Sequence, residues 1–101
     1  MRRFENKVAL VTGGAFGMGA ATAKLFALEG AKVVIADLLE DEASKRVNEI
    51  TELGGEAIYI ELDVTNEDNW ESIIEKIDSE YGRLDVLVNN AGISGSGYQY
   101  L

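Results

Sequence analysis

The sequence contains no cysteine and no histidine among its 101 residues. Without cysteine the chain has no disulfide and no thiolate nucleophile, and without histidine it has neither an imidazole base nor the usual zinc ligands. Any catalysis would need carboxylates, hydroxyls, lysines or a bound cofactor. Basic residues are also few, since nine lysines and arginines stand against eighteen acidic residues, for a formal charge of -9. They are scattered along the chain, which argues against nucleic acid as a partner.

Long apolar runs are missing as well. No run approaches the roughly 20 residues of a membrane-spanning helix, and residues 1–5 lead into a predicted strand without a signal-peptide core. We therefore expect a cytoplasmic protein with no membrane partner. The length allows one domain, and a composition of 47% hydrophobic and 27% charged residues is ordinary for a globular protein.

Four short runs rich in branched apolar residues, 8–11, 33–36, 57–62 and 86–88, are predicted strands. Between them lie three segments with helical spacing, each ending at a glycine (Gly30, Gly54 and Gly82). The third opens with Thr65-x-x-Asp68, which is close to a capping box. The stripes predicted to be buried are Met18, Ala21, Leu25 and Leu28 in the first segment, Leu39, Ala43, Val47, Ile50 and Leu53 in the second, and Trp70, Ile73, Ile74, Ile77 and Tyr81 in the third.

This alternation predicts an α/β fold with a parallel sheet and right-handed crossovers. Four strands in the order 3-2-1-4, with three helices, make half of a Rossmann-type doubly wound sheet. We assign residues 1–93 to this half domain and residues 94–101, which begin Ser-Gly-Ser-Gly, to a linker-like tail. The tail is too short to return through a helix as another strand. An open fourth-strand edge is therefore expected, and it favours a homo-oligomer, most simply a two-fold homodimer joined at the fourth strands or through the uncovered faces. The alternative is a monomer that is prone to aggregate.

Glycines cluster after the first predicted strand, in the stretch VTGGAFGMGAATA at 11–23. The spacing is Thr12-Gly13-x-x-x-Gly17-x-Gly19, at a point where a tight turn brings backbone amides and a helix N-terminus toward an anion. The alternative is a tight turn that serves only close helix packing. Asp37 ends the second predicted strand, where a carboxylate accepts hydrogen bonds from the hydroxyls of an adenosine ribose; the alternative there is a helix N-cap.

The charge around Asp37 favours NAD over NADP. The carboxylate repels a 2'-phosphate, and no arginine or lysine lies in the glycine-rich stretch or immediately after Asp37. Polar residues also follow the third and fourth predicted strands, namely Asp63 and the Asn89-Asn90 pair. Carboxyl ends of parallel strands meet at one rim of a sheet, beside the crevice where the strand order reverses. A turn residue at Asp63 and a plain loop at 89–90 remain alternatives.

Taken together, TGGAFGMG, ADL with Asp37, LDV with Asp63, Trp70 and LDVLVNNAG at 84–92 resemble the N-terminal half of the short-chain dehydrogenase/reductase family, over residues 7–92. The resemblance implies an NAD-binding Rossmann fold and an oxidoreductase. The amides of 13–18 would face the pyrophosphate, Asp37 the adenosine ribose, Asp63 and Val64 the adenine, and residues 90–92 the adenine ribose side. The implied cofactor-binding residues are Gly13, Ala15, Phe16, Gly17, Met18, Gly19, Asp37, Leu38, Asp63, Val64, Asn90, Ala91 and Gly92.

Two departures from the family pattern stand out. Phe16 occupies a position that is usually small or polar, and no tyrosine is followed four residues later by the lysine of the family's catalytic Tyr-x-x-x-Lys. We interpret the chain as a truncated or engineered half domain that binds NAD(H) weakly and turns over no substrate alone. Two alternatives stay open, namely a self-associating half-Rossmann scaffold without a ligand and a dehydrogenase completed by another chain.

Overall fold

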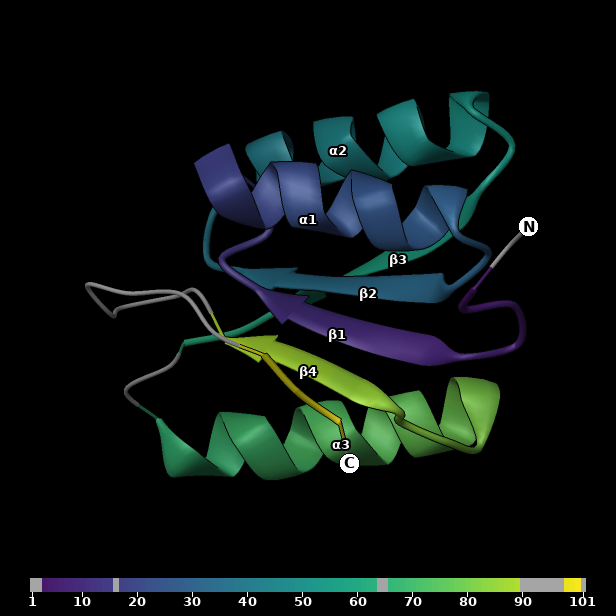
Figure 1. Ribbon diagram of the computed structural model, residues 1–101. Helices are drawn as coiled ribbons and strands as arrows, with labels where there is room; N and C mark the ends of the chain where they lie inside the picture. The colour runs from purple at the N-terminus through teal and green to yellow at the C-terminus, as the bar shows by residue number, and fades with distance from the viewer. Residues whose placement is uncertain (1–2, 16, 64–65, 90–97, 101) are drawn as a thin grey trace.

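The computed structural model describes residues 3–15, 17–63 and 66–89 and the backbone of 98–100. The elements in chain order are β1 (Val8–Thr12), α1 (Gly17–Leu28), β2 (Lys32–Asp37), α2 (Glu40–Glu52), β3 (Glu56–Glu61), α3 (Glu67–Tyr81), β4 (Val86–Asn89) and β5 (Tyr98–Tyr100). The sheet has the order β3-β2-β1-β4-β5, and its first four strands are parallel. Helices α1 and α2 cover one face and α3 covers the other (Figure 1). The predicted order 3-2-1-4 with three helices is confirmed.

Two hydrophobic clusters hold these layers together. All five residues of β1 are buried, as expected of a strand that is covered on both faces. Ala9 and Val11 belong to the cluster under α1 and α2, whereas Val8 and Leu10 belong to the cluster over α3. The same alternation continues through 33–36 in β2, because successive side chains of a strand point to opposite faces. A near-continuous apolar run therefore serves both layers at once.

Helix α1 presents a different face to the sheet from the one predicted. The stripe expected to be buried lies in solvent, with Met18 68%, Leu25 59% and Leu28 56% exposed. The helix instead buries Gly19, Ala20, Ala23, Phe26 and Ala27. Nearly every residue of α1 is apolar, so the spacing alone cannot show which side faces the sheet. Four of these five buried residues are glycine or alanine, so this side of the helix presents little side-chain volume to the sheet.

Helices α2 and α3 agree better with their predicted stripes. In α2, Ala43 and Ile50 are buried while Leu39 and Leu53, which flank the helix, are exposed. In α3, Ile73 and Ile77 are buried, but Ile74, which was also predicted to be buried, is 46% exposed. The three glycines predicted to follow the helices all have positive φ, namely Gly30, Gly54 and Gly82. The N-terminus of α3 differs from the prediction, since Asn66 is the N-cap and its side chain accepts a hydrogen bond from the Asp68 amide. Thr65 lies outside the described residues.

The outer edge of β4 is not open, which corrects the expectation from the sequence. β5 pairs with it in antiparallel register, with Val86 opposite Tyr100 and Val88 opposite Tyr98. The tail is too short for a helical crossover, but an antiparallel neighbour needs no crossover, only a chain reversal. Part of the segment assigned to a linker-like tail is thus a strand. The proposed reason for oligomerisation at the β4 edge disappears with it.

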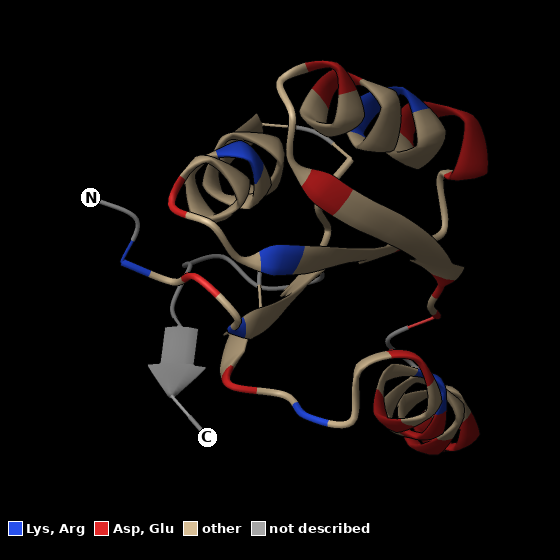
Figure 2. Ribbon diagram, turned by 90° about the vertical axis from the view of Figure 1, so that its right-hand side faces the viewer, with Lys and Arg blue, Asp and Glu red and all other residues tan. Residues whose placement is uncertain are grey.

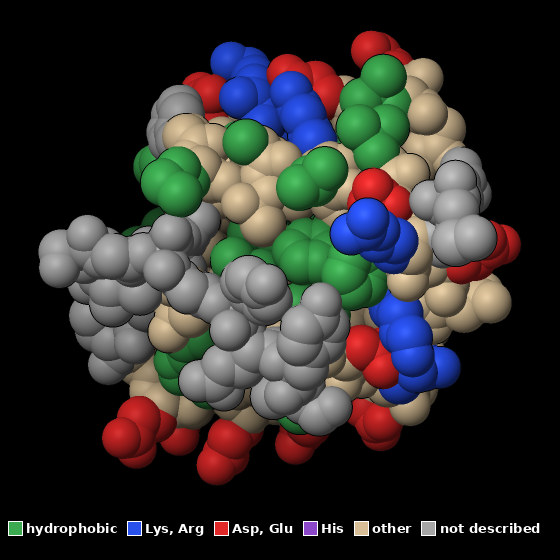
Figure 3. Space-filling view, viewed as in Figure 1, with side chains coloured by type: hydrophobic (Ala, Val, Ile, Leu, Met, Phe, Trp, Pro, Cys, Tyr) green, Lys and Arg blue, Asp and Glu red, His purple; other side chains and the backbone are tan. Residues whose placement is uncertain are grey.

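Charge is distributed unevenly between α1 and α3, which lie on opposite faces of the sheet. Helix α3 contains six acidic residues (Glu67, Asp68, Glu71, Glu75, Asp78 and Glu80) and one lysine, whereas α1 contains one lysine and no acidic residue. Figure 2 shows the acidic side of α3. In Figure 3, hydrophobic side chains reach the surface over α1, and acidic ones line the lower edge. Among the described residues, no helix combines the length and hydrophobicity needed to cross a bilayer.

The amino ends of β1 and β4 are joined by Asp85. Its carboxylate accepts hydrogen bonds from the Val8 amide (2.9 Å) and from Arg83 Nε and Nη2 (2.8 and 2.7 Å), and its own amide donates to the Val8 carbonyl. The hydrogen bond from Arg83 is the largest effect that lowers the pKa of Asp85 below its usual value, and burial opposes it. The folded state therefore favours the ionised carboxylate.

We expect Asp85→Asn to lower the free energy of unfolding at pH 7 by about 1.5–3 kcal/mol, the range for hydrogen bonds to charged groups. A lowered folded-state pKa contributes stability above the unfolded pKa and loses it as the pH falls through the folded value. The deficit should therefore shrink toward pH 3, as measured by urea unfolding at both pH values. Asp78→Asn, on the exposed side of α3, is the control and should change stability by less than about 0.5 kcal/mol. An Asp85→Asn deficit that is the same at both pH values would contradict this account.

Candidate functional site

The glycine-rich turn joins the end of β1 to the start of α1 and lies against β2. Gly13 has φ +67°, in the left-handed region that favours glycine, and its amide donates to the Ala36 carbonyl at 2.8 Å. Gly14 is buried, and a Cβ there would lie 2.9 Å from Ile35 Cγ2 and 3.3 Å from the Val11 carbonyl oxygen. The second glycine is thus required by contact with β2 and not by its own dihedral angles.

Gly14→Ala is expected to destabilise the protein by about 1–3 kcal/mol, because the buried Ile35 must shift to admit the methyl group. Gly17→Asn is the matched control. Its φ is +55°, no atom of the described residues other than its chain neighbours and the backbone of its own helix lies within 4 Å of the position that a Cβ would take, and asparagine tolerates the left-handed region. Urea unfolding should show a cost below about 1 kcal/mol for Gly17→Asn. A larger loss at Gly17 than at Gly14 would show that the described packing of the turn is wrong.

Asp37 connects the turn to the start of α2. Its Oδ2 accepts a hydrogen bond from the Ala15 amide at 3.2 Å, and its Oδ1 accepts one from the Leu39 amide at 3.0 Å. Asp37 is not the N-cap of α2, because Leu39 occupies that position and α2 begins at Glu40. The carboxylate thus bonds the amide of the N-cap residue instead. Each carboxylate oxygen has a further lone pair and can accept another hydrogen bond.

A tyrosine of β3 completes the surroundings of Asp37. The Tyr59 hydroxyl donates to the Asp37 carbonyl oxygen at 2.8 Å, and the Leu62 amide donates to the same oxygen at 3.2 Å. Burial is the main cause that raises the pKa of Tyr59, and neighbouring carboxylates add to it, so the hydroxyl keeps its proton at neutral pH. Sequence reasoning missed this residue, because a tyrosine was sought only with a lysine four residues later. Side chains of β3 point alternately to the two faces of the sheet, and Tyr59 lies on the strand next to β2, which ends at Asp37. This pattern is the signal that could have identified it.

Asp63 lies just beyond β3, and its amide donates to Asn69 Oδ1 at 2.9 Å. Asn69 belongs to the first turn of α3, so this bond joins the end of β3 to the start of the next helix. Sequence reasoning did not identify Asn69 as part of the rim. Of the other predicted site residues, Phe16, Val64, Asn90, Ala91 and Gly92 lie outside the described residues.

The ends of β1 and β4 meet through Thr12 and Asn89, which lie opposite each other in the register. The fully buried Thr12 hydroxyl lies 2.9 Å from Asn89 Oδ1 and 3.3 Å from the Val88 carbonyl oxygen. Because a hydroxyl has only one proton to donate, and the contact with Asn89 Oδ1 is the shorter, we assign the hydrogen bond to Asn89. This pair closes the boundary between β1 and β4, where the strand order reverses and ligands of open α/β sheets bind.

The structure thus brings the described candidates to one rim of the sheet, at the carboxyl ends of β1, β2 and β3 (Figure 1). Gly13, Ala15 and Asp37 are linked through β2, while Gly17 and Met18 are exposed at the start of α1. Leu38 is exposed, and Gly19 is buried within α1. The amides of Gly13 and Ala15 already have partners in the protein. The first four amides of a helix lack intrahelical partners, so α1 supplies the other donors at this rim.

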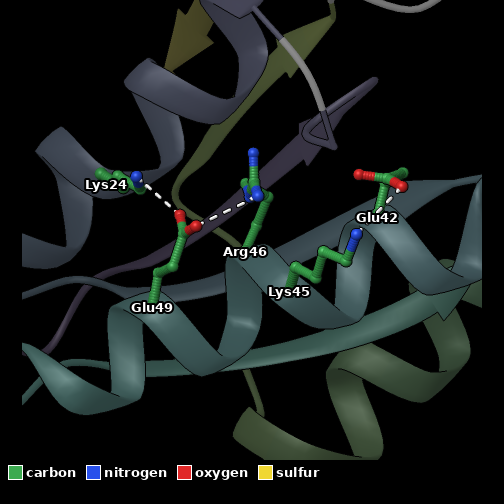
Figure 4. Close-up of polar contacts among 5 residues, drawn as sticks. All are labelled: Lys24, Glu42, Lys45, Arg46 and Glu49. Carbon is green, nitrogen blue, oxygen red and sulfur yellow. Dashed lines mark hydrogen bonds and ion pairs between the residues drawn. The ribbon is translucent and has the colours of Figure 1, made fainter.

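The positive side chains of α1 and α2 are engaged in ion pairs (Figure 4). Lys24 Nζ lies 2.6 Å from Glu49 Oε1, and Arg46 Nη2 lies 3.0 Å from Glu49 Oε2. The hydrogen bond from Lys24 is the largest cause that lowers the pKa of Glu49. Lys45 pairs with Glu42 at 3.4 Å. The described part of the chain also contains no group of three or more acidic, cysteine or histidine side chains placed to hold a metal ion.

The comparisons with known proteins agree with this geometry. The family model described as short chain dehydrogenase matches residues 7–100. Tropinone reductase-like 1 of Erythroxylum coca is 50% identical over 92 residues, which cover 91% of this chain and 33% of that protein. Cyclopentanol dehydrogenase of Comamonas testosteroni is 50% identical over 93 residues, which cover 92% of this chain and 37% of that protein.

A solved structure of a hydroxysteroid dehydrogenase from Escherichia coli superposes with a TM-score of 0.87 at 40% identity, covering 92% of this chain and 40% of that one. The chain therefore spans about a third of the length of the curated relatives named above. Because the family model covers nearly all of this sequence and this solved structure superposes over 92% of it, the chain belongs to the short-chain dehydrogenase family.

Proposed function

We propose that this chain binds the adenosine half of NAD(H) and forms the N-terminal, cofactor-binding part of an oxidoreductase. The observation that carries the proposal is the Asp37 carboxylate at the end of β2, hydrogen-bonded to the glycine-rich turn. An acceptor for ribose hydroxyls thus adjoins a turn and a helix N-terminus suited to phosphate. Members of this family typically bind a nicotinamide cofactor.

The candidate site residues that the structure describes have different parts in this proposal. Asp37 would accept hydrogen bonds from the ribose hydroxyls through its remaining lone pairs, and the amides at the start of α1 would bind the pyrophosphate. Gly13 and Ala15 shape the turn, and Asp63 borders the place of the adenine. The cofactor itself supplies hydride transfer. Thr12 and Asn89 hold the carboxyl ends of β1 and β4 together at this rim.

The charges around Asp37 support NAD over NADP. A 2'-phosphate beside the carboxylate would be repelled unless a cation compensated. The arginine and lysine of α2, Arg46 and Lys45, are paired with Glu49 and Glu42. Either cation would have to break its ion pair in order to bind the 2'-phosphate of NADP.

Calorimetric titration tests the choice of cofactor. We expect NAD to bind in the millimolar range, because half of the contacts of a site with an affinity near 1 μM, about -8 kcal/mol, would be absent. NADP should bind at least tenfold more weakly. Equal affinities would overturn the assignment to NAD, and low-micromolar NAD binding would overturn the expectation of a half site.

The proposal includes no turnover by this chain acting alone. Reduction of a carbonyl needs a proton donor for the oxygen, a contribution worth roughly 10² to 10⁴ in rate. No tyrosine here has a lysine four residues later. Activity that appears only after a C-terminal fragment of a family member is added would support completion by another chain.

The second candidate function is that of a self-associating scaffold, in which copies of this chain form a cytoplasmic homo-oligomer. The observation that favours it is the exposed apolar stripe of α1, with Met18, Leu25 and Leu28 all more than half exposed. Sedimentation at several concentrations, with and without NAD, separates the candidates. A mass that rises with concentration and is indifferent to NAD, together with melting curves that NAD does not shift, would favour the scaffold.

A further inference from the structure

Asp37 is held from two sides. Its carbonyl oxygen accepts hydrogen bonds from the Tyr59 hydroxyl (2.8 Å) and the Leu62 amide (3.2 Å), and its carboxylate accepts from the amides of Ala15 and Leu39. A carbonyl oxygen has two lone pairs, and both are used here by groups from β3 and the residue that follows it. The orientation of the peptide unit between Asp37 and Leu38 is therefore set by β3.

This orientation matters because β2 ends at Asp37. The last register pair between β2 and β3 is Asp37 with Glu61, and beyond it residues 38–39 belong to no helix or strand. A rotation of the 37–38 peptide would swing the Leu39 amide away from Asp37 Oδ1. Without the Leu39 amide, the carboxylate would be free to rotate about its side-chain bonds, which would weaken its hydrogen bond from the Ala15 amide. The Tyr59 hydroxyl opposes this rotation together with the Leu62 amide, at the end of the pairing between β2 and β3.

Tyr59 is well placed for this task. It lies in the middle of β3 opposite Ile35 of β2, and its ring packs against the cluster under α1 and α2. The ring is half-buried, so the hydroxyl is partly shielded from water that could replace its partner. Hydrogen bonds thus connect the glycine-rich turn after β1 to the Asp37 carboxylate at the end of β2, and the Asp37 carbonyl to the Tyr59 hydroxyl of β3.

We propose that Tyr59 is a positioning residue for Asp37 and, through Asp37, for the glycine-rich turn. The part that concerns ligand affinity rests on the proposed function, whereas the part that concerns the turn does not. Tyr59→Phe isolates the hydroxyl, because it retains the ring and its packing.

Tyr81→Phe is the matched control. Tyr81 is also partly buried, and its ring lies 5.4 Å from Nζ of Lys32, the first residue of β2, at the opposite rim of the sheet from Asp37. Both variants lose one tyrosine hydroxyl, so both can lose some thermal stability. Only Tyr59→Phe should change ligand affinity and amide exchange at the rim that contains Asp37.

The probe is ADP, which contains the ribose and diphosphate that the rim would bind, titrated by calorimetry into the full chain. We expect Tyr59→Phe to weaken ADP binding about three- to tenfold, the range for one hydrogen bond, and Tyr81→Phe to leave it unchanged. Weakening of ADP binding to the same extent by Tyr59→Phe and Tyr81→Phe would show that the Tyr59 hydroxyl acts only on general stability, and this result would overturn the proposal.

A measurement without ligand keeps the proposal separate from the proposed function. Amide hydrogen exchange followed by NMR should be faster at Ala15 and Leu39 in Tyr59→Phe, and unchanged there in Tyr81→Phe. If the unmodified chain binds no ADP or NAD at millimolar concentration, the proposed function fails, and the exchange rates alone decide the role of Tyr59. If the chain binds ADP while Tyr59→Phe alters neither affinity nor exchange, the positioning role fails and the proposed function stands.

Discussion

Replacing Asp37 by alanine is expected to abolish the rise in melting temperature that NAD produces. The substitution removes the acceptor proposed for the ribose hydroxyls and also releases the amides of Ala15 and Leu39. Because a ligand stabilises the folded state by mass action, NAD at ten times its Kd should stabilise the unmodified chain by about 1.4 kcal/mol. For a domain of this size that is a shift of several degrees, roughly 6–10 °C. Thermal melts of the unmodified chain and of Asp37→Ala at increasing NAD concentration measure this shift in melting temperature.

The control for Asp37 is another acidic residue that lies away from the rim. Asp78→Ala removes a carboxylate from the last turns of α3 and should retain the full response to NAD. Asp37→Ala is expected to melt somewhat lower even without NAD, since two hydrogen bonds within the protein are lost. If Asp37→Ala retained the full NAD response, the ribose would have to bind elsewhere and the proposed function would lose its main support.

Phe26→Ala is expected to cost about 3–5 kcal/mol of unfolding free energy, as is typical of a buried aromatic truncated to alanine. Phe26 is 8% exposed, and its ring meets that of Phe4 edge-on with centroids 4.9 Å apart. A domain has only about 5–15 kcal/mol of stability in total, so the variant is expected to be marginal. Urea unfolding at several protein concentrations measures the loss and detects any association.

Leu25→Ala is the matched comparison in the same helix. Leu25 is 59% exposed, so its truncation should change stability by less than about 0.5 kcal/mol. The pair also separates the two descriptions of α1, since the sequence pattern places Leu25 in the core. Equal losses at both positions would mean that α1 is rotated from the described orientation, because adjacent residues lie about 100° apart around a helix.

Much of the fold follows from local patterns. Runs such as 8–11 and 33–36 are apolar at every position, and a strand covered on both faces needs such a run, so the parallel sheet could be predicted. The helix ends at Gly30, Gly54 and Gly82 could also be predicted, because the left-handed conformation is inexpensive only for glycine. The topology then places Gly13, Asp37 and Asp63 at one rim, since all parallel strands end on the same side.

Other features depend on contacts between residues far apart in the chain. The inward face of α1 could not be predicted, because a helix that is apolar almost all round has no preferred side until the sheet selects the residues that pack most closely. β5 escaped prediction because a three-residue strand is stable only beside β4, and nothing within Tyr98–Tyr100 requires that pairing. Two partners of Asp37 were likewise hidden, since Ala15 and Tyr59 approach it only once the strands are side by side, whereas Leu39 is a local partner two residues along the chain. Composition and spacing thus determine which elements form and in what order, because backbone preference and burial act locally. Which faces meet and which side chains hold the rim is settled by packing in three dimensions.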